Sequence, residues 1–270
     1  MSNTGKQIRL RRVLRANRGT LAVAFDHALV LGPIPGTLDP GTQIARFVEN
    51  QADAILLNLG MFRYLGSISS AHPLPGLIAR IDWTTAMGTA SHLPQDNFRS
   101  SAVAHPEDAL RLGADAVISF LVVGSGDVEF ERNEILRNGQ IARECDRIGM
   151  PLIVETVARG PRVHNPRSPE WLALHTRIAA ELGADVIKTE WSGDAETMSK
   201  VVEGCPIPIL VLGGSREGSD QDVLQSVRDI MQSGAAGVFF GRNVFQADNM
   251  PELLSAIRGV LSETRPNPRN

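Results

Sequence analysis

The chain contains few cysteines, one tyrosine and three lysines, and these scarcities restrict its possible functions. Its two cysteines, Cys145 and Cys205, lie far apart and form no CxxC or cysteine–histidine pattern. We therefore expect small buried side chains in a reducing compartment rather than a disulfide framework. No apolar run approaches the roughly 20 residues that span a bilayer, so we expect no membrane partner.

The composition gives no sign of a nucleic-acid partner or a metal centre. The formal net charge is −3, with 43% hydrophobic and 21% charged residues, which is typical of an ordinary globular protein. No basic excess indicates binding to nucleic acid. The 6 histidines show no HExxH spacing, and neither GxGxxG nor a phosphate-loop motif occurs. We expect no metal and no organic cofactor.

Residues 1–19 are basic and contain no acidic residue. The basic residues are Lys6, Arg9, Arg11, Arg12, Arg15 and Arg18. This composition is similar to that of a transit peptide, yet no secretory apolar region or small-residue cleavage site follows. We expect instead a lead-in helix and a cytoplasmic location. The side chains expected to pack on the body of the protein are Ile8, Leu10, Val13 and Leu14.

Short apolar runs alternate with amphipathic segments along the chain. The runs cover residues 21–25, 54–57, 77–81, 116–121, 152–154, 186–187, 207–212 and 238–240. They are continuously hydrophobic, which is typical of parallel strands covered by helices. The clearest amphipathic segments span residues 129–148, 169–182 and 221–233. The pattern predicts an α/β fold, a (β/α)8 TIM barrel with a short N-terminal helix.

A repeated joint between helix and strand favours the barrel over an open, doubly wound sheet. The phrase LGADAV at 112–117 returns as LGADVI at 182–187, and SGAAGVFF at 233–240 is similar. In each case a helix ends at a glycine and a strand follows at once. An open sheet that binds a dinucleotide would carry a glycine-rich turn after its first strand, and FDHALVLGP is not such a turn. Because no linker divides the chain, we predict one domain over residues 1–270.

Lys188 is the strongest candidate for catalysis. It ends the apolar run of ADVIKTEW, whereas Lys6 and Lys200 lie in polar or amphipathic segments. A lysine at the carboxyl end of a barrel strand is partly desolvated, which favours the neutral amine. A neutral amine attacks a carbonyl, and the resulting imine lets a neighbouring carbon–carbon bond break. An ion pair with Glu190 or Asp26 is the alternative interpretation.

Three further residues are candidates for proton transfer. Asp26 and His27 follow the first strand, and Glu155 follows the fifth. A carboxylate directly after an apolar strand needs a partner, such as Lys188 or a substrate hydroxyl. The alternatives are a packing or capping role for His27 and a salt bridge between Glu155 and an arginine of the following loop.

Two glycine-centred turns follow the seventh and eighth strands. ILVLGGSREG places Gly213, Gly214 and Ser215 in the first turn, and GVFFGRNVF places Gly241 and Arg242 in the second. Barrel enzymes commonly bind phosphate with these two loops, because bare backbone N–H groups can approach the phosphate oxygens. The arginine adds a cation that suits phosphate. Tight turns without a ligand are the alternative.

The chain resembles the class I aldolases that include the archaeal-type fructose-bisphosphate aldolases and their bacterial relatives. The resemblance runs from about residue 20 to residue 262 and is carried by AFDHALVLGPIPG, LGADAV, IGMPLIVE, IKTEWSGD, CPIPILVLGG and GAAGVFFGRNVFQ. It implies that Lys188 forms the Schiff base, that Asp26 is the strand-one aspartate and that the two glycine turns bind phosphate. It also implies a homo-oligomer, often a decamer.

One departure from the family pattern lies after the fifth strand. Typical members carry a tyrosine proton donor in a YPRG-like turn, and this chain reads TVARG, with Val157 at the tyrosine position. If the chain is an aldolase, Asp26, Glu155, His27 or a bound water must then transfer the proton.

Three functions are therefore compatible with the sequence. The first is a metal-independent class I aldolase that cleaves or forms a carbon–carbon bond in a phosphorylated ketose or related small carbonyl compound. The second is a thiolase-like acyltransferase that uses the same lysine imine and coenzyme A, since the relative that degrades phosphorylated autoinducer-2 also lacks the tyrosine. The third is a sugar-phosphate binding protein without catalysis.

Overall fold

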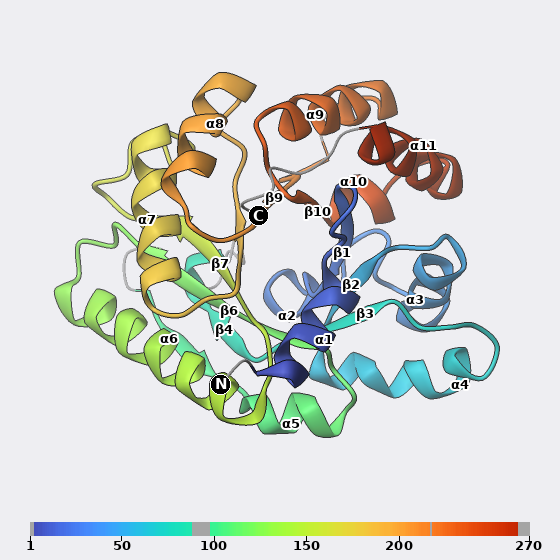
Figure 1. Ribbon diagram of the computed structural model, residues 1–270, viewed down its shortest axis with the longest axis horizontal. Helices are drawn as coiled ribbons and strands as arrows, with labels where there is room; N and C mark the ends of the chain where they lie inside the picture. Colours follow the sequence, from blue (N-terminus) through green and yellow to red (C-terminus); the bar gives the residue numbers. More distant parts are fainter. Residues whose placement is uncertain (1–2, 88–97, 217, 264–270) are drawn as a thin grey trace.

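The fold is a closed barrel of eight parallel strands. The computed structural model describes residues 3–87, 98–216 and 218–263. Each barrel strand pairs with the barrel strands that precede and follow it in the sequence, and the last strand pairs with the first. They are β1 (Thr20–Phe25), β2 (Ala54–Asn58), β3 (Gly76–Arg80), β6 (Ala116–Val123), β7 (Leu152–Ala158), β8 (Val186–Thr189), β9 (Ile209–Leu212) and β10 (Gly237–Phe240). Helices surround the barrel (Figure 1), and the predicted (β/α)8 architecture is confirmed.

The strand boundaries differ from the predicted ones mainly at the carboxyl ends. The strands β6, β7 and β8 each continue beyond the apolar run that predicted them. In β7 and β8 the polar residues Glu155 and Lys188 face the barrel interior and pair with each other, so they do not end the strands, whereas β6 gains the apolar residues Val122 and Val123. In the opposite sense, β3 lies one residue earlier than predicted and β9 begins two residues later.

The helices on the outside begin and end at residues suited to those positions. They are α1 (Thr4–Val13), α2 (Ala28–Leu31), α3 (Pro40–Glu49), α4 (Leu65–Ser69), α5 (Pro106–Arg111), α6 (Val128–Ile148), α7 (Pro169–Glu181), α8 (Ala195–Gly204), α9 (Asp220–Gln232), α10 (Arg242–Phe245) and α11 (Met250–Glu263), with 3-10 turns η1 (Leu59–Tyr64) and η2 (Thr85–Met87). Side chains of Ser168, Asp194 and Ser219 accept backbone N–H groups at helix starts. Gly113 and Gly183 follow helix ends with φ of 85° and 102°, as the repeated joint predicts.

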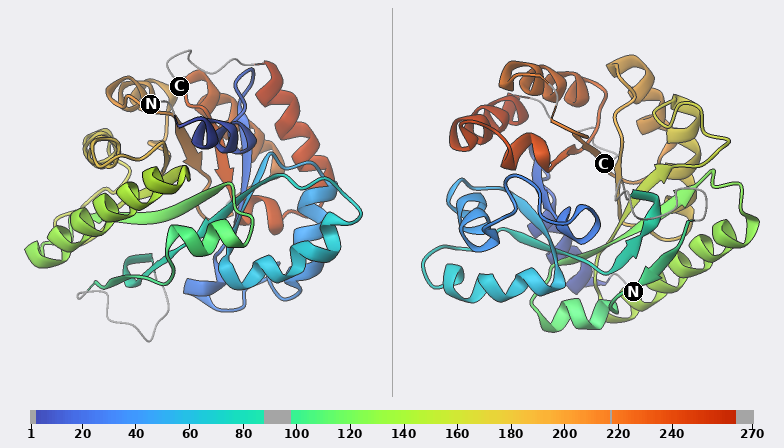
Figure 2. Two further views of the ribbon diagram at one scale, coloured as in Figure 1. Left: turned by 60° about the horizontal axis from the view of Figure 1, so that its bottom comes forward. Right: turned by 180° about the vertical axis from the view of Figure 1, so that it is seen from behind.

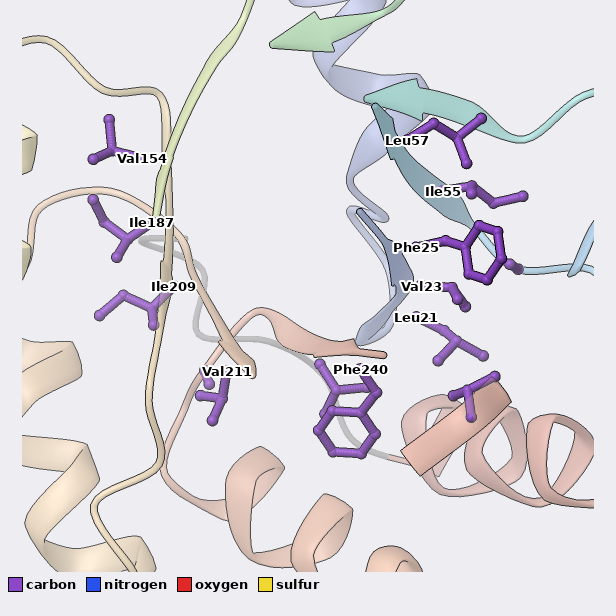
Figure 3. Packing of buried hydrophobic residues seen from close by; sticks show 14 of the residues in the cluster. Leu21, Val23, Phe25, Ile55, Leu57, Val154, Ile187, Ile209, Val211 and Phe240 are labelled. Atoms are coloured by element: carbon purple, nitrogen blue, oxygen red, sulfur yellow. The ribbon is translucent and has the colours of Figure 1, made fainter. Parts of the chain in front are cut away.

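Strand side chains alternate between two apolar layers. Outward-facing residues pack against the helices, and the labelled side chains of Figure 3 point away from the barrel on both sides: Leu21, Val23, Phe25, Ile55, Leu57, Val154, Ile187, Ile209, Val211 and Phe240. Inward-facing residues fill the barrel: Ala22, Ala54, Leu56, Ile78, Ala116, Ile118, Ile153, Val186, Leu210 and Phe239. Both faces of the sheet are thus covered, which explains the continuous hydrophobicity of the runs. The two cysteines are free and buried, as expected.

The basic lead-in segment closes the amino-terminal end of the barrel. Leu10, Val13 and Leu14 pack against the interior layer, as predicted. The prediction for Ile8 is wrong: its side chain is 59% exposed, because it lies on the outer face of α1. In Figure 2 (left), α1 crosses one end of the barrel, and α2 lies at the other.

Three aspartates hold this closed end together. Asp53, Asp115 and Asp185 accept the backbone N–H of Leu21, Leu77 and Leu152, each on a neighbouring strand. Basic residues of the lead-in segment neutralise them, in the pairs Arg15–Asp53 (2.8 Å), Arg18–Asp53 (2.7 Å), Arg12–Asp115 (3.2 Å) and Lys6–Asp185 (2.8 Å). The positive charge of residues 1–19 is therefore matched by the barrel itself.

An antiparallel pair of short strands stands at the carboxyl end of the barrel. The strands β4 (Asp82–Thr84) and β5 (Ser100–Ala102) lie inside the long connection that showed no periodicity in the sequence. The middle of that connection, residues 88–97, is outside the described residues. Within the described ranges, none of the helices combines the length and apolar character needed to cross a membrane. A single domain over residues 1–270 stays a prediction.

The buried histidine of α7 gives a testable pH dependence of stability. His175 is fully buried, and burial, assisted by the charge of Arg159, lowers its pKa from 6.5 to about 3. Below about pH 6.5, His175 therefore binds a proton in the unfolded chain but not in the folded chain. The free energy of unfolding consequently falls as the pH drops from 6.5 toward 3. In His175→Leu, the loss of unfolding free energy between pH 7.5 and pH 5 is expected to shrink by about 2 kcal/mol.

Urea unfolding of both proteins at the two pH values measures this difference. His72→Leu serves as the control, since His72 is exposed and its removal should leave the pH dependence as in the wild type. An identical loss of stability in His175→Leu and the wild type would contradict the prediction.

Candidate active site

A cavity of about 830 Å³ opens at the carboxyl ends of the barrel strands. All of the residues singled out from the sequence line it: Asp26, His27, Glu155, Lys188, Gly213, Gly214, Ser215, Gly241 and Arg242. They come from five separate parts of the chain, and closure of the barrel brings them together. The cavity lies at the end where barrel enzymes place their chemistry.

Lys188 reaches this cavity from within β8. Its side chain faces the barrel interior, because its neighbours Ile187 and Thr189 face the other way. The residue is 4% exposed, and its Nζ lies 2.9 Å from Oε1 of Glu155 and 4.7 Å from the centre of the Phe239 ring. The carboxylate and the aromatic face both stabilise a cation, so the amine is held in one place inside the barrel.

Glu155 lies in the middle of β7 rather than at its end, where the sequence placed it. One carboxylate oxygen contacts Lys188, and the other accepts a hydrogen bond from Nη2 of Arg80. The expected alternative, a pair with an arginine of the following loop, is wrong, because Arg159 pairs with Glu190 at 2.9 Å. Glu190 is thereby also engaged away from Lys188.

Arg80 is the central residue that the sequence interpretation missed. It lies on β3 and is 2% exposed; its Nε donates to Oδ2 of Asp26 at 2.9 Å, and its Nη1 lies 3.4 Å from Oδ1 of Asp82. Its guanidinium stacks 3.8 Å from the centre of the Phe120 ring. The signal was present in LIARID: two charged residues two positions apart on a strand face the same side.

The carboxylate network continues behind Arg80 to the helix α6. Asp82 accepts hydrogen bonds from Nη1 of Arg137 and from the backbone N–H of Phe120. Glu134 pairs with Arg137 at 2.6 Å. The pKa of Arg137 is raised, because these carboxylates outweigh the effect of burial. The charges around the cavity are thus paired into a continuous buried array.

Asp26 follows β1 and points into the same cavity. Burial alone would raise its pKa, but the charges of Arg80 and Lys188 outweigh burial and lower it to about 2. Its backbone oxygen accepts a hydrogen bond from Asn58 on β2 at 2.9 Å, which fixes the strand end. Asp26 is therefore ionised at neutral pH and can accept a proton but not donate one.

His27 also lines the cavity, beside Asp26. Its Nδ1 lies 3.8 Å from Oδ1 of Asp26, and its ring packs edge-on against Phe245 at 5.2 Å. Burial lowers its pKa, helped by the cations Lys188 and Arg242, and the opposing charges of Asp26 and Glu155 do not reverse this shift. The imidazole is therefore neutral at pH 7.

The two glycine turns lie side by side on one wall. The Nδ2 of Asn243 donates to the backbone oxygen of Gly213 at 3.1 Å, which joins the turns. A Cβ at Gly213 would collide with that amide, and a Cβ at Gly241 would collide with the His27 ring. Gly214 has φ of 67°. Only glycine fits these positions, so the wall presents bare backbone to the cavity.

An apolar side chain lies at the position where the family resemblance led us to look for a tyrosine. Val157 is fully buried against Phe120, Val122 and Phe130. No proton donor is available from this side chain. Among the described residues, no group of three or more histidine, cysteine, aspartate or glutamate side chains is arranged to hold a metal ion.

This arrangement defines the class of enzyme. A buried lysine held by a carboxylate at the carboxyl end of a (β/α)8 barrel suits a class I aldolase, which breaks or forms carbon–carbon bonds through a lysine imine. The chain belongs to the DeoC/LacD family of aldolases, whose sequence profile matches residues 20–247.

Individual relatives agree with this assignment. The chain is 36% identical over 263 residues to 2-amino-3,7-dideoxy-D-threo-hept-6-ulosonate synthase of Halobacterium salinarum, covering 97% of this chain and 94% of the relative. It is 33% identical over 245 residues to 2-amino-4,5-dihydroxy-6-oxo-7-(phosphonooxy)heptanoate synthase of Streptomyces griseus, covering 90% and 85%. The structure matches an archaeal fructose-1,6-bisphosphate aldolase, whose catalytic lysine was captured bound to a carbinolamine, with TM-score 0.82, 27% identity and coverage of 95% and 99%.

Proposed function

We propose that this aldolase acts on a small phosphorylated ketose or related carbonyl compound and that Lys188 is its Schiff-base residue. The observation that carries the proposal is the buried Lys188 amine, 2.9 Å from Glu155, inside a cavity with a wall of bare glycine backbone. The carbinolamine-bound lysine of the archaeal aldolase supports an imine route.

The cavity residues suit each step of imine chemistry. The Lys188 ammonium gives a proton to Glu155, and the neutral amine adds to the substrate carbonyl carbon to form a carbinolamine. Loss of water, with the proton returned by Glu155, leaves a protonated imine. The bond between the α and β carbons then breaks as the β hydroxyl loses its proton, and its electron pair forms the double bond of an enamine. Protonation of the enamine carbon and addition of water to the imine release the second product and restore the Lys188 amine. The reverse sequence forms the bond.

The hydroxyl that becomes an aldehyde during cleavage must lose its proton. Asp26 is ionised and lines the cavity, so we assign it this role, with the neutral His27 beside it as a proton carrier. In the bond-forming direction the pair first takes the proton of the α carbon as the enamine forms and then gives that proton to the new hydroxyl. This assignment replaces the tyrosine of typical family members, whose position Val157 occupies.

The glycine turns are the proposed phosphate site. Backbone N–H groups around Gly213, Gly214, Ser215 and Gly241, together with Arg242, suit phosphate oxygens. The phosphonooxy group in the name of the Streptomyces griseus relative supports a phosphorylated reactant, and its being a synthase favours the bond-forming direction. A homo-oligomer, possibly built as a decamer, and a cytoplasmic location stay predictions from the sequence.

Borohydride trapping tests the proposal directly. The protein is incubated with dihydroxyacetone phosphate, fructose 1,6-bisphosphate and other small carbonyl phosphates, reduced with borohydride and mapped by peptide mass spectrometry. Reduction converts an imine into a stable secondary amine, so we expect a mass increase on the peptide that contains Lys188. Lys6 and Lys200 are internal controls and should stay unmodified.

The other outcomes separate the competing functions. Formation of an acyl thioester when coenzyme A is added would show the thiolase-like reaction on the same lysine. Binding of the phosphates without any adduct on Lys188 would overturn the proposal in favour of a sugar-phosphate binding protein.

A further inference from the structure

Arg80 contacts both carboxylates that surround Lys188. Its Nε donates to Asp26 at 2.9 Å, and its Nη2 donates to Glu155, whose other oxygen contacts the Lys188 amine. All four side chains are at least nine-tenths buried. One guanidinium therefore connects the carboxylate that holds the amine with the carboxylate that follows β1.

The charge balance around the amine depends on this guanidinium. The charged or titratable groups nearest to Lys188 come from four strands and the turns that follow them, namely Asp26, His27, Arg80, Glu155 and Arg242. Without Arg80, the buried carboxylates Asp26 and Glu155 would have Lys188 as the nearest positively charged residue on a barrel strand. Opposite charges stabilise an ammonium strongly in a desolvated interior, so the amine would then lose its proton with more difficulty.

We propose that Arg80 is a positioning residue for imine formation, which fixes Asp26 and Glu155 around the Lys188 amine and offsets their negative charge. This inference rests on the proposed function, because it concerns the same amine. The guanidinium suits the task, since its fork bonds to two carboxylates at once while its face stacks on Phe120 at 3.8 Å. A lysine in its place would keep the charge without the fork.

The test measures the rate of borohydride trapping on Lys188 between pH 5 and pH 9, with dihydroxyacetone phosphate as the probe. Arg80→Met is expected to move the acid limb of this profile to higher pH by about one unit, so that trapping on the limb falls about tenfold. Arg80→Lys is expected to restore the position of the limb but to trap about tenfold more slowly at the plateau.

Asp82→Asn is the matched control. Asp82 contacts Nη1 of Arg80, whereas Glu155 contacts Nη2 and is the carboxylate that pairs with Lys188, so the replacement of Asp82 disturbs the same buried array without removing the partner of the amine. This variant is expected to lose stability and to keep the acid limb of the wild type. A purely structural role for Arg80 would lower the folded fraction in both variants and move neither limb.

The outcomes distinguish this inference from the proposed function. Trapping in the wild type together with an unmoved limb in a folded Arg80→Met would overturn only the role of Arg80. If Arg80→Met does not fold, Arg80→Lys decides, because a wild-type plateau rate in that variant would overturn the inference. A wild-type protein that cannot be trapped by any carbonyl compound would overturn the proposed function and the inference with it.

Discussion

Replacing Lys188 by methionine is expected to reduce turnover by at least about 10⁴-fold, because the residue supplies the nucleophile and no neighbouring group can form an imine. Methionine keeps the length and apolar stem of the side chain, so the stacking on Phe239 and the shape of the cavity are retained. The substrate that traps best is assayed for turnover, and binding of its phosphate is measured by calorimetry. Binding should persist while turnover is lost.

Lys200→Met is the control for this experiment. Lys200 lies on the exposed face of α8 and pairs with Glu196 at 3.1 Å, far from any role in the cavity. Its replacement should leave turnover unchanged. If Lys188→Met kept more than a tenth of the wild-type rate, the imine route would be wrong.

Glu155→Gln is expected to lower kcat by about 10² to 10⁴-fold, the range typical of a lost general acid–base group. Glutamine has the same shape and can still contact Lys188, but it can neither take the proton of the ammonium nor return one during the loss of water. It also leaves Lys188 and Arg80 with one fewer carboxylate between them. Steady-state turnover and the rate of trapping should therefore fall together, since formation of the imine needs a group beside the amine that takes up and returns protons.

Glu190→Gln provides the matched comparison. Glu190 is also buried near the cavity, but it pairs with Arg159 and Arg167 and does not contact Lys188. This variant should retain most of the trapping rate. Equal losses in the two variants would mean that burial of a carboxylate, and not its contact with the amine, explains the effect.

The barrel could be predicted because its signals are local. Apolar runs, glycine joints and amphipathic helices are each readable within a short window of sequence, and all eight runs became barrel strands. The place of Lys188 in the cavity could be predicted for a similar reason, since a cation directly after an apolar run needs an explanation wherever the strand lies; its catalytic role stays a prediction. The places of the two glycine turns could be predicted because the turns directly follow the seventh and eighth apolar runs, which form the last two strands of the barrel.

The partners of these residues could not be predicted in the same way. Arg80 lies 75 residues from Glu155 in the chain, and only the closure of the barrel sets them against each other. Glu155 was placed at a strand end because polarity was taken to end the strand, whereas its cationic partners let β7 continue to Ala158. Contacts between side chains across a barrel interior depend on strand order and register, which a single sequence does not state.

The helix α1 closes the amino-terminal end of the barrel, so the interior is open only at the carboxyl end of the strands. Leu10, Val13 and Leu14 pack against the interior layer there, so reactants and products must enter and leave the cavity at the carboxyl ends of the strands. With Lys188 in its proposed role, the reactant that it binds lies deepest in the cavity and must enter before the second reactant covers it. It also leaves last, as part of the product. The closed amino-terminal end therefore fixes the order in which the two reactants bind, although none of its residues takes part in the reaction.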